Sequence, residues 1–106
     1  MEREIKFLVN AVKWFDRVNG NTYHSARIER VKDGAILKSG IEYGYGDGYR
    51  QTALEVMALN NWIPAEYNDY LESGIKKLGF YERENNYPIV WSVSDGLKRE
   101  MKNNIS

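Results

Sequence analysis

Two turn-forming dipeptides, Asn19-Gly20 and Asp33-Gly34, divide the first 43 residues into three segments rich in β-branched and aromatic side chains. Asn-Gly and Asp-Gly favour two-residue hairpin turns, because both turn positions need a positive φ. β-Branched and aromatic side chains are enriched in strands. The pattern therefore predicts a three-stranded antiparallel meander, with strands over residues 5–16, 22–32 and 35–43.

Two-residue turns at these positions also specify how the strands pair. Because side chains alternate between the two faces of a strand, both turns place their apolar residues on the same face. We expect this face, which also includes Val9, to form the core. The predicted pairs are Phe15 with His24, Ala11 with Ile28, Ala26 with Ile41, and His24 with Tyr43.

The second half of the chain carries helical periodicity and one further strand. The spacing of apolar residues predicts a helix over residues 49–60, with Asp47 as its N-cap, and a second over residues 64–79, closed by Gly79. Residues 87–94 alternate as a strand, and residues 97–104 form a short basic segment that begins as a helix. The expected fold class is α+β, an antiparallel three-stranded meander followed by two helices on one face and a C-terminal strand (β-β-β-α-α-β). That last strand pairs either within the sheet or with a second subunit.

Composition limits what the protein can do. The chain has 106 residues, of which 42% are hydrophobic, and this suits one domain with a single core. Fifteen basic and fifteen acidic side chains cancel, so the net charge does not favour a nucleic acid polymer or a membrane as partner. The absence of cysteine excludes disulfides and thiolate chemistry, and it fits a cytoplasmic protein.

A segment rich in glycine and tyrosine, residues 43–49, joins the third strand to the first helix. Its alternating glycines differ from the dinucleotide-binding fingerprint, which has a longer spacing within a parallel βαβ unit. One interpretation is a tight connection between strand and helix. The other is an anion site, in which the backbone amides from Gly46 to Arg50 and the Arg50 side chain contact a ligand, with Tyr45 beside them.

No group of side chains in the sequence favours catalysis. His24 is the only histidine, and its place on the expected core face favours a structural role over ligand binding. Glu66, Asp69 and Glu72 share one face of the second predicted helix, where a solvated surface is a better interpretation than a metal site. The sequence therefore predicts a binding protein that is not an enzyme and uses no metal or cofactor.

Two groups of residues near the C-terminus suit a nucleotide ligand. Lys98 and Arg99 follow the last strand and are placed to reach phosphate, which arginine binds through two parallel hydrogen bonds. The second group combines rings that stack on a base with amides that bind its edge. The alternative interpretations are a solvated helix end and a packed loop. The second group comprises Phe80, Tyr81, Asn85, Asn86 and Tyr87.

Three segments resemble small phage and prophage proteins. They are residues 12–25 (VKWFDRVNGNTYHS), 43–47 (YGYGD) and 91–99 (WSVSDGLKR). Among such proteins the chain is most similar to the first type of Thoeris anti-defence sponge. That family sequesters cyclic ADP-ribose isomers made by bacterial TIR enzymes, without cleaving them. Some of its members also hold cyclic oligonucleotides at other subunit interfaces.

The resemblance implies a homo-oligomer built from dimers, with nucleotide pockets made by both subunits, in the cytoplasm of an infected bacterium. It also implies an aromatic residue for the base, an amide and a C-terminal arginine, which correspond here to Phe80, Asn85 or Asn86, and Arg99. Two other hypotheses stay open. One is a phage inhibitor that binds a host defence protein directly, such as a CRISPR nuclease, and the other is a small virion or assembly protein.

Overall fold

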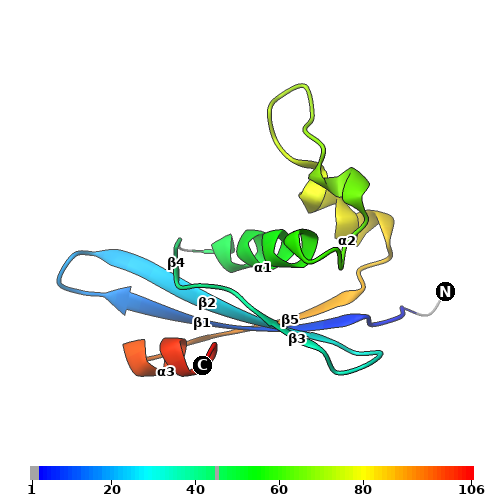
Figure 1. Ribbon diagram of the computed structural model, residues 1–106. Coiled ribbons are helices and arrows are strands. Elements are labelled where there is room, and N and C mark those ends of the chain that lie inside the picture. The colour runs from blue at the N-terminus through cyan, green and yellow to red at the C-terminus, as the bar shows by residue number, and fades with distance from the viewer. Residues whose placement is uncertain (1–2, 45) are drawn as a thin grey trace.

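The computed structural model describes residues 3–44 and 46–106, which form one mixed sheet with helices on both faces (Figure 1). The expected α+β class is confirmed, because an antiparallel meander is followed by a helical region and then by a C-terminal strand. The strands are β1 (Phe7–Asp16), β2 (Asn21–Arg30), β3 (Ile36–Lys38), β4 (Glu42–Tyr43) and β5 (Ile89–Asp95). The spatial order is β3-β2-β1-β5, and β4 also pairs with β2.

The helical part differs from the prediction in one of its two helices. The helix expected over residues 49–60 is present as α1, and the expected C-terminal helix is present as α3. None of the described helices is long and apolar enough to span a membrane. The helices are α1 (Gly48–Leu59), α2 (Tyr81–Glu84) and α3 (Lys98–Asn103), with two 3₁₀ turns, η1 (Ala65–Asn68) and η2 (Lys77–Phe80).

The first hairpin closes through a longer turn than predicted. Asp16 pairs with Asn21, so the connection contains residues 17–20, and Phe15 lies opposite Thr22 instead of His24. The Asp16 carboxylate accepts hydrogen bonds from the Val18 amide (3.0 Å) and from the Asn19 side chain (2.8 Å), which hold this longer turn. The Asn19 bond is also the main cause of a lowered pKa for Asp16.

The change in register is two residues, and this preserves the predicted face. Because side chains repeat with period two along a strand, a shift of two leaves each side chain on its original side of the sheet. Five of the residues assigned to the core face are therefore buried as expected. They are Val9, Ala11, His24, Ala26 and Ile28.

The expected third strand is interrupted, and here the predicted pairing is wrong. Ile28 pairs with Leu37, but His24 pairs with Glu42, so the third segment contains one extra residue between these two points. A single extra residue moves every later side chain of that segment to the opposite face of the sheet. Tyr43 therefore lies opposite Tyr23, on the other face from His24, and is 62% exposed.

Ser39 marks the start of this interruption. Its hydroxyl accepts a hydrogen bond from the Ala26 amide (2.8 Å), while its own amide donates to the Ala26 carbonyl (2.8 Å). Ala26 is therefore paired with Ser39 and not with Ile41, which is 43% exposed. The predicted Ala26–Ile41 and His24–Tyr43 pairs are both incorrect.

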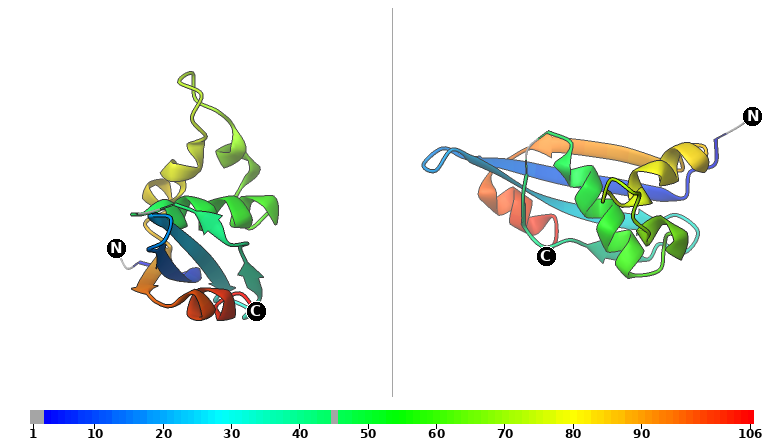
Figure 2. Two further views of the ribbon diagram at one scale, coloured as in Figure 1. Left: turned by 90° about the vertical axis from the view of Figure 1, so that its left-hand side faces the viewer. Right: turned by 90° about the horizontal axis from the view of Figure 1, so that it is seen from above.

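The helix predicted over residues 64–79 does not form. η1 is followed by an outward arm that is closed by a bridge between Tyr70 and Lys76, and η2 returns the chain to the core (Figures 1 and 2). Gly74 sits at a φ of 84° at the arm's tip, a left-handed conformation that ends helical propagation. Gly79 lies inside η2 and does not close a long helix. Of the apolar residues at helical spacing in this range, Tyr67, Leu71, Ile75 and Leu78, only Tyr67 and Leu78 are buried.

The main core lies between α1 and the sheet. Ala53, Met57 and Ala26 are fully buried, and small side chains at two of these three positions let the helix approach the strands closely. Ile89 of β5 joins this core because β5 pairs in parallel with β1, so the last strand lies within the sheet. The chain reaches β5 from β4 through α1 and α2, which lie over this face of the sheet (Figure 1).

α3 packs on the face of the sheet opposite α1, a placement on which the sequence made no prediction (Figure 1). Met101, on α3 itself, is 1% exposed. The Ser25 hydroxyl donates to the Met101 carbonyl (2.6 Å), and the Asn104 amide donates to the carbonyl of Asn10 (3.1 Å) and to the Ser25 hydroxyl (3.2 Å). α3 and the residue after it are thus held by polar contacts, one of them buried, in addition to one apolar anchor.

Candidate ligand-binding cleft

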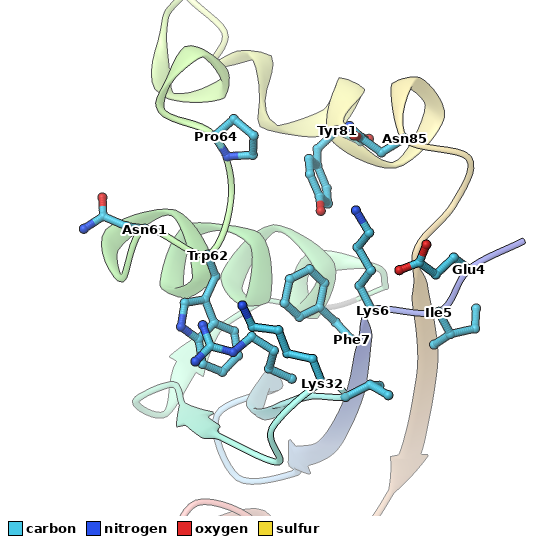
Figure 3. A pocket seen from close by; sticks show the side chains of 12 residues that line it. Glu4, Ile5, Lys6, Phe7, Lys32, Asn61, Trp62, Pro64, Tyr81 and Asn85 are labelled. Atoms are coloured by element: carbon cyan, nitrogen blue, oxygen red, sulfur yellow. The ribbon is translucent and has the colours of Figure 1, made fainter.

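A cleft of about 620 Å³ opens at the end of the sheet where β1 starts and β2 ends (Figure 3). We call it the cationic cleft. It lies between these strand ends, the segment after α1, and α2. Its basic side chains are Lys6, Arg30 and Lys32, its carboxylate is Glu4, its amides are Asn61 and Asn85, and its aromatic residues are Phe7, Trp62 and Tyr81.

The C-terminal end of α1 determines where Trp62 lies. Asn61 adopts a left-handed conformation with a φ of 60°. The backbone N–H of Asn61 donates to the Ala58 carbonyl (3.1 Å), and the backbone N–H of Trp62 donates to the Met57 carbonyl (2.9 Å). This pair of bonds is a Schellman motif, which closes a helix and reverses the chain direction. The reversal carries the indole of Trp62 onto Phe7, with ring centroids 5.8 Å apart.

Arg30 is held in place over Trp62. Its guanidinium carbon lies 4.5 Å from the indole centroid. Two hydrogen bonds join it to the Asp33 carboxylate, from Nε to Oδ1 (3.0 Å) and from Nη2 to Oδ2 (2.7 Å). The hydrogen bond from Arg30 is the main cause that lowers the pKa of Asp33 to about 2. Arg30 and Asp33 therefore form a neutral, oriented pair at neutral pH, and Arg30 acts mainly as a support for the indole.

The two lysines of the cleft are not neutralised in this way. In the part of the chain that the structure describes, the Arg30–Asp33 pair is the only salt bridge, so neither Lys6 nor Lys32 has a carboxylate partner there. Figure 3 shows Lys6 extending from the start of β1 toward Tyr81, with Lys32 lower in the view. With Arg30 cancelled by Asp33, two lysines against Glu4 leave the cleft with positive charge.

A chain of hydrogen bonds sets the orientation of the Asn85 amide. Tyr67 donates its hydroxyl hydrogen to the Glu84 carboxylate (2.8 Å), and this bond raises the pKa of Tyr67. The Tyr67 oxygen then accepts from Asn85 Nδ2 (3.2 Å), which also donates to the Tyr81 carbonyl (2.8 Å). Both hydrogens of the Asn85 amide are used. Its Oδ1, which no described group contacts by a hydrogen bond, is therefore available to accept one from a ligand.

Of the candidate nucleotide-binding residues named from the sequence, Tyr81 and Asn85 line the cationic cleft. Phe80 lines a smaller hollow of about 330 Å³ beside Tyr67, and the Arg83 guanidinium lies 5.0 Å from its ring. Asn86 and Tyr87 are exposed and adopt positive φ values of 58° and 52°. The short stretch that was predicted to surround one base is thus distributed over two hollows and an exposed turn.

The described part of the glycine-rich segment, residues 43–49, does not line the cationic cleft. Tyr45 lies outside the described residues. Gly46 lines a third hollow near the β1–β2 turn. Arg50 lies over Trp91 of β5, 5.0 Å from the ring, and its bond to the Tyr49 hydroxyl raises its pKa. Asp47 occupies the predicted N-cap position of α1, but its side chain makes no capping hydrogen bond.

His24 is buried, in agreement with the structural role favoured by the sequence. Its Nε2 lies 2.6 Å from the Thr52 hydroxyl of α1, and its Nδ1 lies 3.3 Å from the Gly44 carbonyl. A Cβ added at Gly44 would lie 3.2 Å from the imidazole. His24 therefore ties the glycine-rich segment to α1, and glycine at position 44 allows the backbone to pass close to the ring.

Lys98 and Arg99 lie on α3, across the sheet from α2 (Figure 1). The Lys98 ammonium is 5.3 Å from the Trp14 ring, and Arg99 is exposed. One copy of the chain therefore does not bring Arg99 together with Phe80 or Asn85. The predicted helix face that carried Glu66, Asp69 and Glu72 is absent, and no three potential metal ligands gather anywhere within residues 3–44 and 46–106.

Sequence reasoning missed most of the cationic cleft, including its basic side chains Lys6, Arg30 and Lys32 and the indole of Trp62. The available signals were weak. Arg30 and Lys32 flank a turn, and Trp62 follows two asparagines at a helix end, which are ordinary places for such residues. Nothing in the sequence places the end of α1 over the end of the β1–β2 pair.

Comparison with known proteins found no match: no protein-family model fits this chain, and no curated protein and no solved structure is similar to it.

Proposed function

We propose that the protein binds a small cyclic nucleotide signal and sequesters it without cleaving it. The observation that carries this proposal is the cationic cleft, whose volume of about 620 Å³ lies within the range typical of small-molecule sites. Such sites combine apolar walls with a few polar groups that orient the ligand. The cleft has both, because Phe7, Trp62 and Tyr81 line it beside its lysines and Asn85.

The polar groups of the cleft complement those of a nucleotide. Ammonium groups of Lys6 and Lys32 suit phosphate oxygens. Asn85 Oδ1 suits a donor such as a ribose hydroxyl or the amino group of a base.

The setting follows from the resemblance to phage anti-defence sponges. We propose a phage protein in the cytoplasm of an infected bacterium, with a cyclic ADP-ribose isomer as the ligand. Cyclic oligonucleotides are further candidate ligands, and no nucleic acid polymer or membrane partner is expected. Lys98 and Arg99 lie across the sheet from Phe80 and Asn86, so they could share a ligand with them only if a second copy took part.

The free edge of β5 supports such a homodimer. β5 pairs with β1 on one side only, and its outer edge has no neighbour among the described strands. Val90 and Val93 are exposed along it, and residues 89–95 contain neither lysine nor proline. Lysine and proline on an edge strand hinder its pairing with a further strand. Because β5 has neither, its outer edge can pair with β5 of a second copy.

The proposal is tested by incubating the protein with cyclic ADP-ribose, removing free ligand by filtration, and heating the protein fraction. Sequestration predicts that intact ligand is depleted from the filtrate and returns after heating, as measured by liquid chromatography with mass spectrometry. Return of a hydrolysed product would make the protein an enzyme. Absence of depletion for cyclic ADP-ribose isomers and cyclic oligonucleotides alike would remove the proposed function.

Two substitutions distinguish the cleft from a pocket shared between subunits. Arg99→Ala leaves stability within about 0.5 kcal/mol, because Arg99 is exposed. If Arg99 contributes to a shared pocket, affinity falls; an unchanged affinity removes it from the site. Lys102→Ala, on the same helix, is the matched control and should change neither stability nor affinity.

A second candidate function, inhibition of a host protein by direct contact, is favoured by a different surface. The third hollow, of about 740 Å³, is lined by the exposed apolar residues Phe15, Val18 and Leu97 together with Trp14. Exposed apolar patches of this kind mark protein interaction sites. Co-purification of one host protein that is lost in Phe15→Ser, with no thermal shift from nucleotides, would favour this candidate over sequestration.

A further inference from the structure

β5 lies along one edge of the sheet, and its backbone groups alternate between β1 and that edge (Figure 2). The Gly96 N–H donates to the Lys13 carbonyl (2.8 Å), and the Pro88 carbonyl accepts from the Lys6 N–H (2.8 Å). Even-numbered residues of this strand therefore face β1, because successive residues of a strand direct their backbone groups to opposite sides. The N–H and C=O groups of its odd-numbered residues point outward, where no described strand pairs with them.

Arg3 occupies the first part of this edge. Its Nε donates to the Tyr87 carbonyl (2.6 Å), and its Nη2 donates to the Ile89 carbonyl (3.1 Å). The guanidinium thus takes the place that the N–H groups of a neighbouring strand would take, and it closes the edge as far as Ile89. The outward-facing backbone groups from residue 91 to the end of the strand remain open.

Two opposite charges lie on the α1 face of this open stretch. The Arg50 guanidinium of α1 covers Trp91, 5.0 Å from its ring centroid. Asp95 lies on the same face, because its register partner Lys13 is in turn paired with His24, which lies beneath α1. Both charged side chains are exposed, and within residues 3–44 and 46–106 neither forms a salt bridge.

We propose that β5 pairs antiparallel with β5 of a second copy about Val93, and that Arg50 binds the partner subunit's Asp95 across this pair. The inference rests on the homodimer in the proposed function and specifies how its two chains meet. Pairing about Val93 places Trp91 opposite the partner's Asp95, on the same face of the joined sheet. Because Arg50 covers Trp91, its guanidinium is brought to that carboxylate, and two-fold symmetry forms the contact twice.

Arg3 determines the register. Hydrogen-bonded antiparallel pairs need outward groups on both strands, so only odd-numbered residues of β5 can pair in this way. A pairing centred at any point before Val93 would bring Ile89 into the ladder, and Arg3 already holds the Ile89 carbonyl. The pairing about Val93 is therefore the longest that leaves this contact intact. On the other face of the sheet, it places Ser92 opposite the partner's Ser94, in a pair without hydrogen bonds between their backbones.

Disulfide crosslinking tests the register, because the chain contains no cysteine and a single introduced one reports on one position. Ser92→Cys and Ser94→Cys chains, the second isotope-labelled, are mixed and mildly oxidised without nucleotide. Residues opposite one another in a pair of this kind have Cα atoms about 4.5 Å apart, which a disulfide can bridge. Mass spectrometry should find a light–heavy crosslink in the mixture and no crosslink in either variant alone. A crosslink in Ser92→Cys alone, or none in the mixture, would overturn this register.

The role of Arg3 has its own test. Arg3→Ala frees the carbonyls of Tyr87 and Ile89, so a register centred on Ser92 gains its outer pair. In the Arg3→Ala background we therefore expect Ser92→Cys to crosslink with itself. Lys102→Ala, at an exposed position of α3, is the control background and should leave the crosslinking pattern unchanged. The same pattern with and without Arg3 would show that Arg3 does not set the register.

Charge reversal tests the contact between Arg50 and Asp95, with the dissociation constant of the dimer measured by analytical ultracentrifugation. Arg50→Glu and Asp95→Arg should each weaken the dimer about tenfold or more, because each places like charges at both copies of the contact. The double variant should recover the dimer, since the charges are exchanged and not removed. Glu55→Lys, at an exposed position of α1, is the control. Lack of recovery in the double variant would remove the contact.

None of these measurements needs a nucleotide, so they separate the interface from sequestration. A dimer with the expected crosslink that depletes no nucleotide would support the interface and remove the proposed function. An unmodified protein with the mass of one chain at every concentration would overturn the interface, and sequestration would stand if that monomer still depleted cyclic ADP-ribose.

Discussion

The cationic cleft and the third hollow lie at opposite ends of the β1–β2 pair and differ in what covers them. At the end where β1 starts, the closing turn of α1 and the short α2 pack over the strands and enclose the cationic cleft. At the other end the hairpin projects past α1 (Figure 1), and Phe15 and Val18 are 54% and 92% exposed. The same two strands thus support a charged, framed cleft at one end and an open apolar surface at the other.

The contrast shows that the covering elements decide whether each end is framed or open, whereas the charged groups of both ends come from the strands and the residues beside them. The cationic cleft contains a neutral Arg30–Asp33 pair and two lysines without carboxylate partners among the described residues. In the third hollow, beside the β1–β2 turn, the charges of Lys13 and Arg17 are balanced by those of Asp16 and Asp95. A small anion suits the first end, and an apolar protein surface suits the second.

The largest expected effect comes from removing the support that frames the cationic cleft. Met57 is fully buried on α1, and its carbonyl accepts the Trp62 amide. Met57→Ala leaves a cavity and should lower the free energy of unfolding by about 2–5 kcal/mol, as measured by urea denaturation. Leu59→Ala, at an 83% exposed position of the same helix, is the control and should stay within about 0.5 kcal/mol. Equal losses in the two variants would contradict the packing described for α1.

A smaller effect should follow on the other face, where α3 is held by polar contacts. Ser25→Ala removes the hydroxyl that bonds Met101 and Asn104. Leaving a buried acceptor unpaired should lower the free energy of unfolding by about 1–3 kcal/mol. Amide hydrogen exchange should accelerate first in α3, while residues around Trp62 keep their protection. Ser92→Ala, at an exposed position, is the control, and acceleration around Trp62 as large as in α3 would contradict independence of the two faces.

A smaller loss of stability should come from changing the turn that positions Trp62. Asn61 has a φ of 60°, which glycine adopts without a Cβ penalty and alanine does not. Asn61→Ala should lower the free energy of unfolding by about 1 kcal/mol, whereas Asn61→Gly should change it little. Thermal denaturation followed by circular dichroism measures both variants. Equal stability of the alanine and glycine variants would argue against the left-handed turn that carries Trp62 into the cleft.

The smallest expected effect is a pH dependence at the Arg30–Asp33 pair. The pKa of Asp33 is lowered to about 2 from an ordinary value of 3.8, mainly by its hydrogen bond with Arg30. Because the folded pKa is the lower one, ionised Asp33 stabilises the protein above pH 3.8, and this contribution is lost as the pH falls toward 2. The difference in melting temperature between the unmodified protein and Asp33→Asn should shrink over this range. A difference that stays constant from pH 6 to pH 2 would exclude the ionised pair.

Local chemistry explains which parts of the fold were predictable. The turns at Gly20 and Gly34 lie where the dipeptides indicated, and both glycines have positive φ values. The register was wrong because side chains of the turn, above all Asp16, stabilise a longer loop than the dipeptide alone implies. The 64–79 helix was wrong because apolar spacing does not distinguish a helix from two short turns separated by an arm.

The candidate site was less predictable than the fold. Asn85 was assigned a ligand-binding role from the sequence and does line the cationic cleft. Arg99 and Lys98 were grouped with it, but the structure places them across the sheet. The difference arises because α3 lies on the face opposite α1, and the side of a sheet on which a terminal helix packs depends on distant partners such as Ser25.

The sequence by itself determined the core face of the first hairpin, the helix α1 and the α+β class. These depend on periodicity and turn chemistry, which are local, and the period of two survives even a shift of register by two residues. Tertiary structure alone decided that β5 pairs in parallel beside β1 and that Trp62 covers the end of the β1–β2 pair near Lys6. These arrangements join residues more than 50 positions apart, and packing in three dimensions is what selects them.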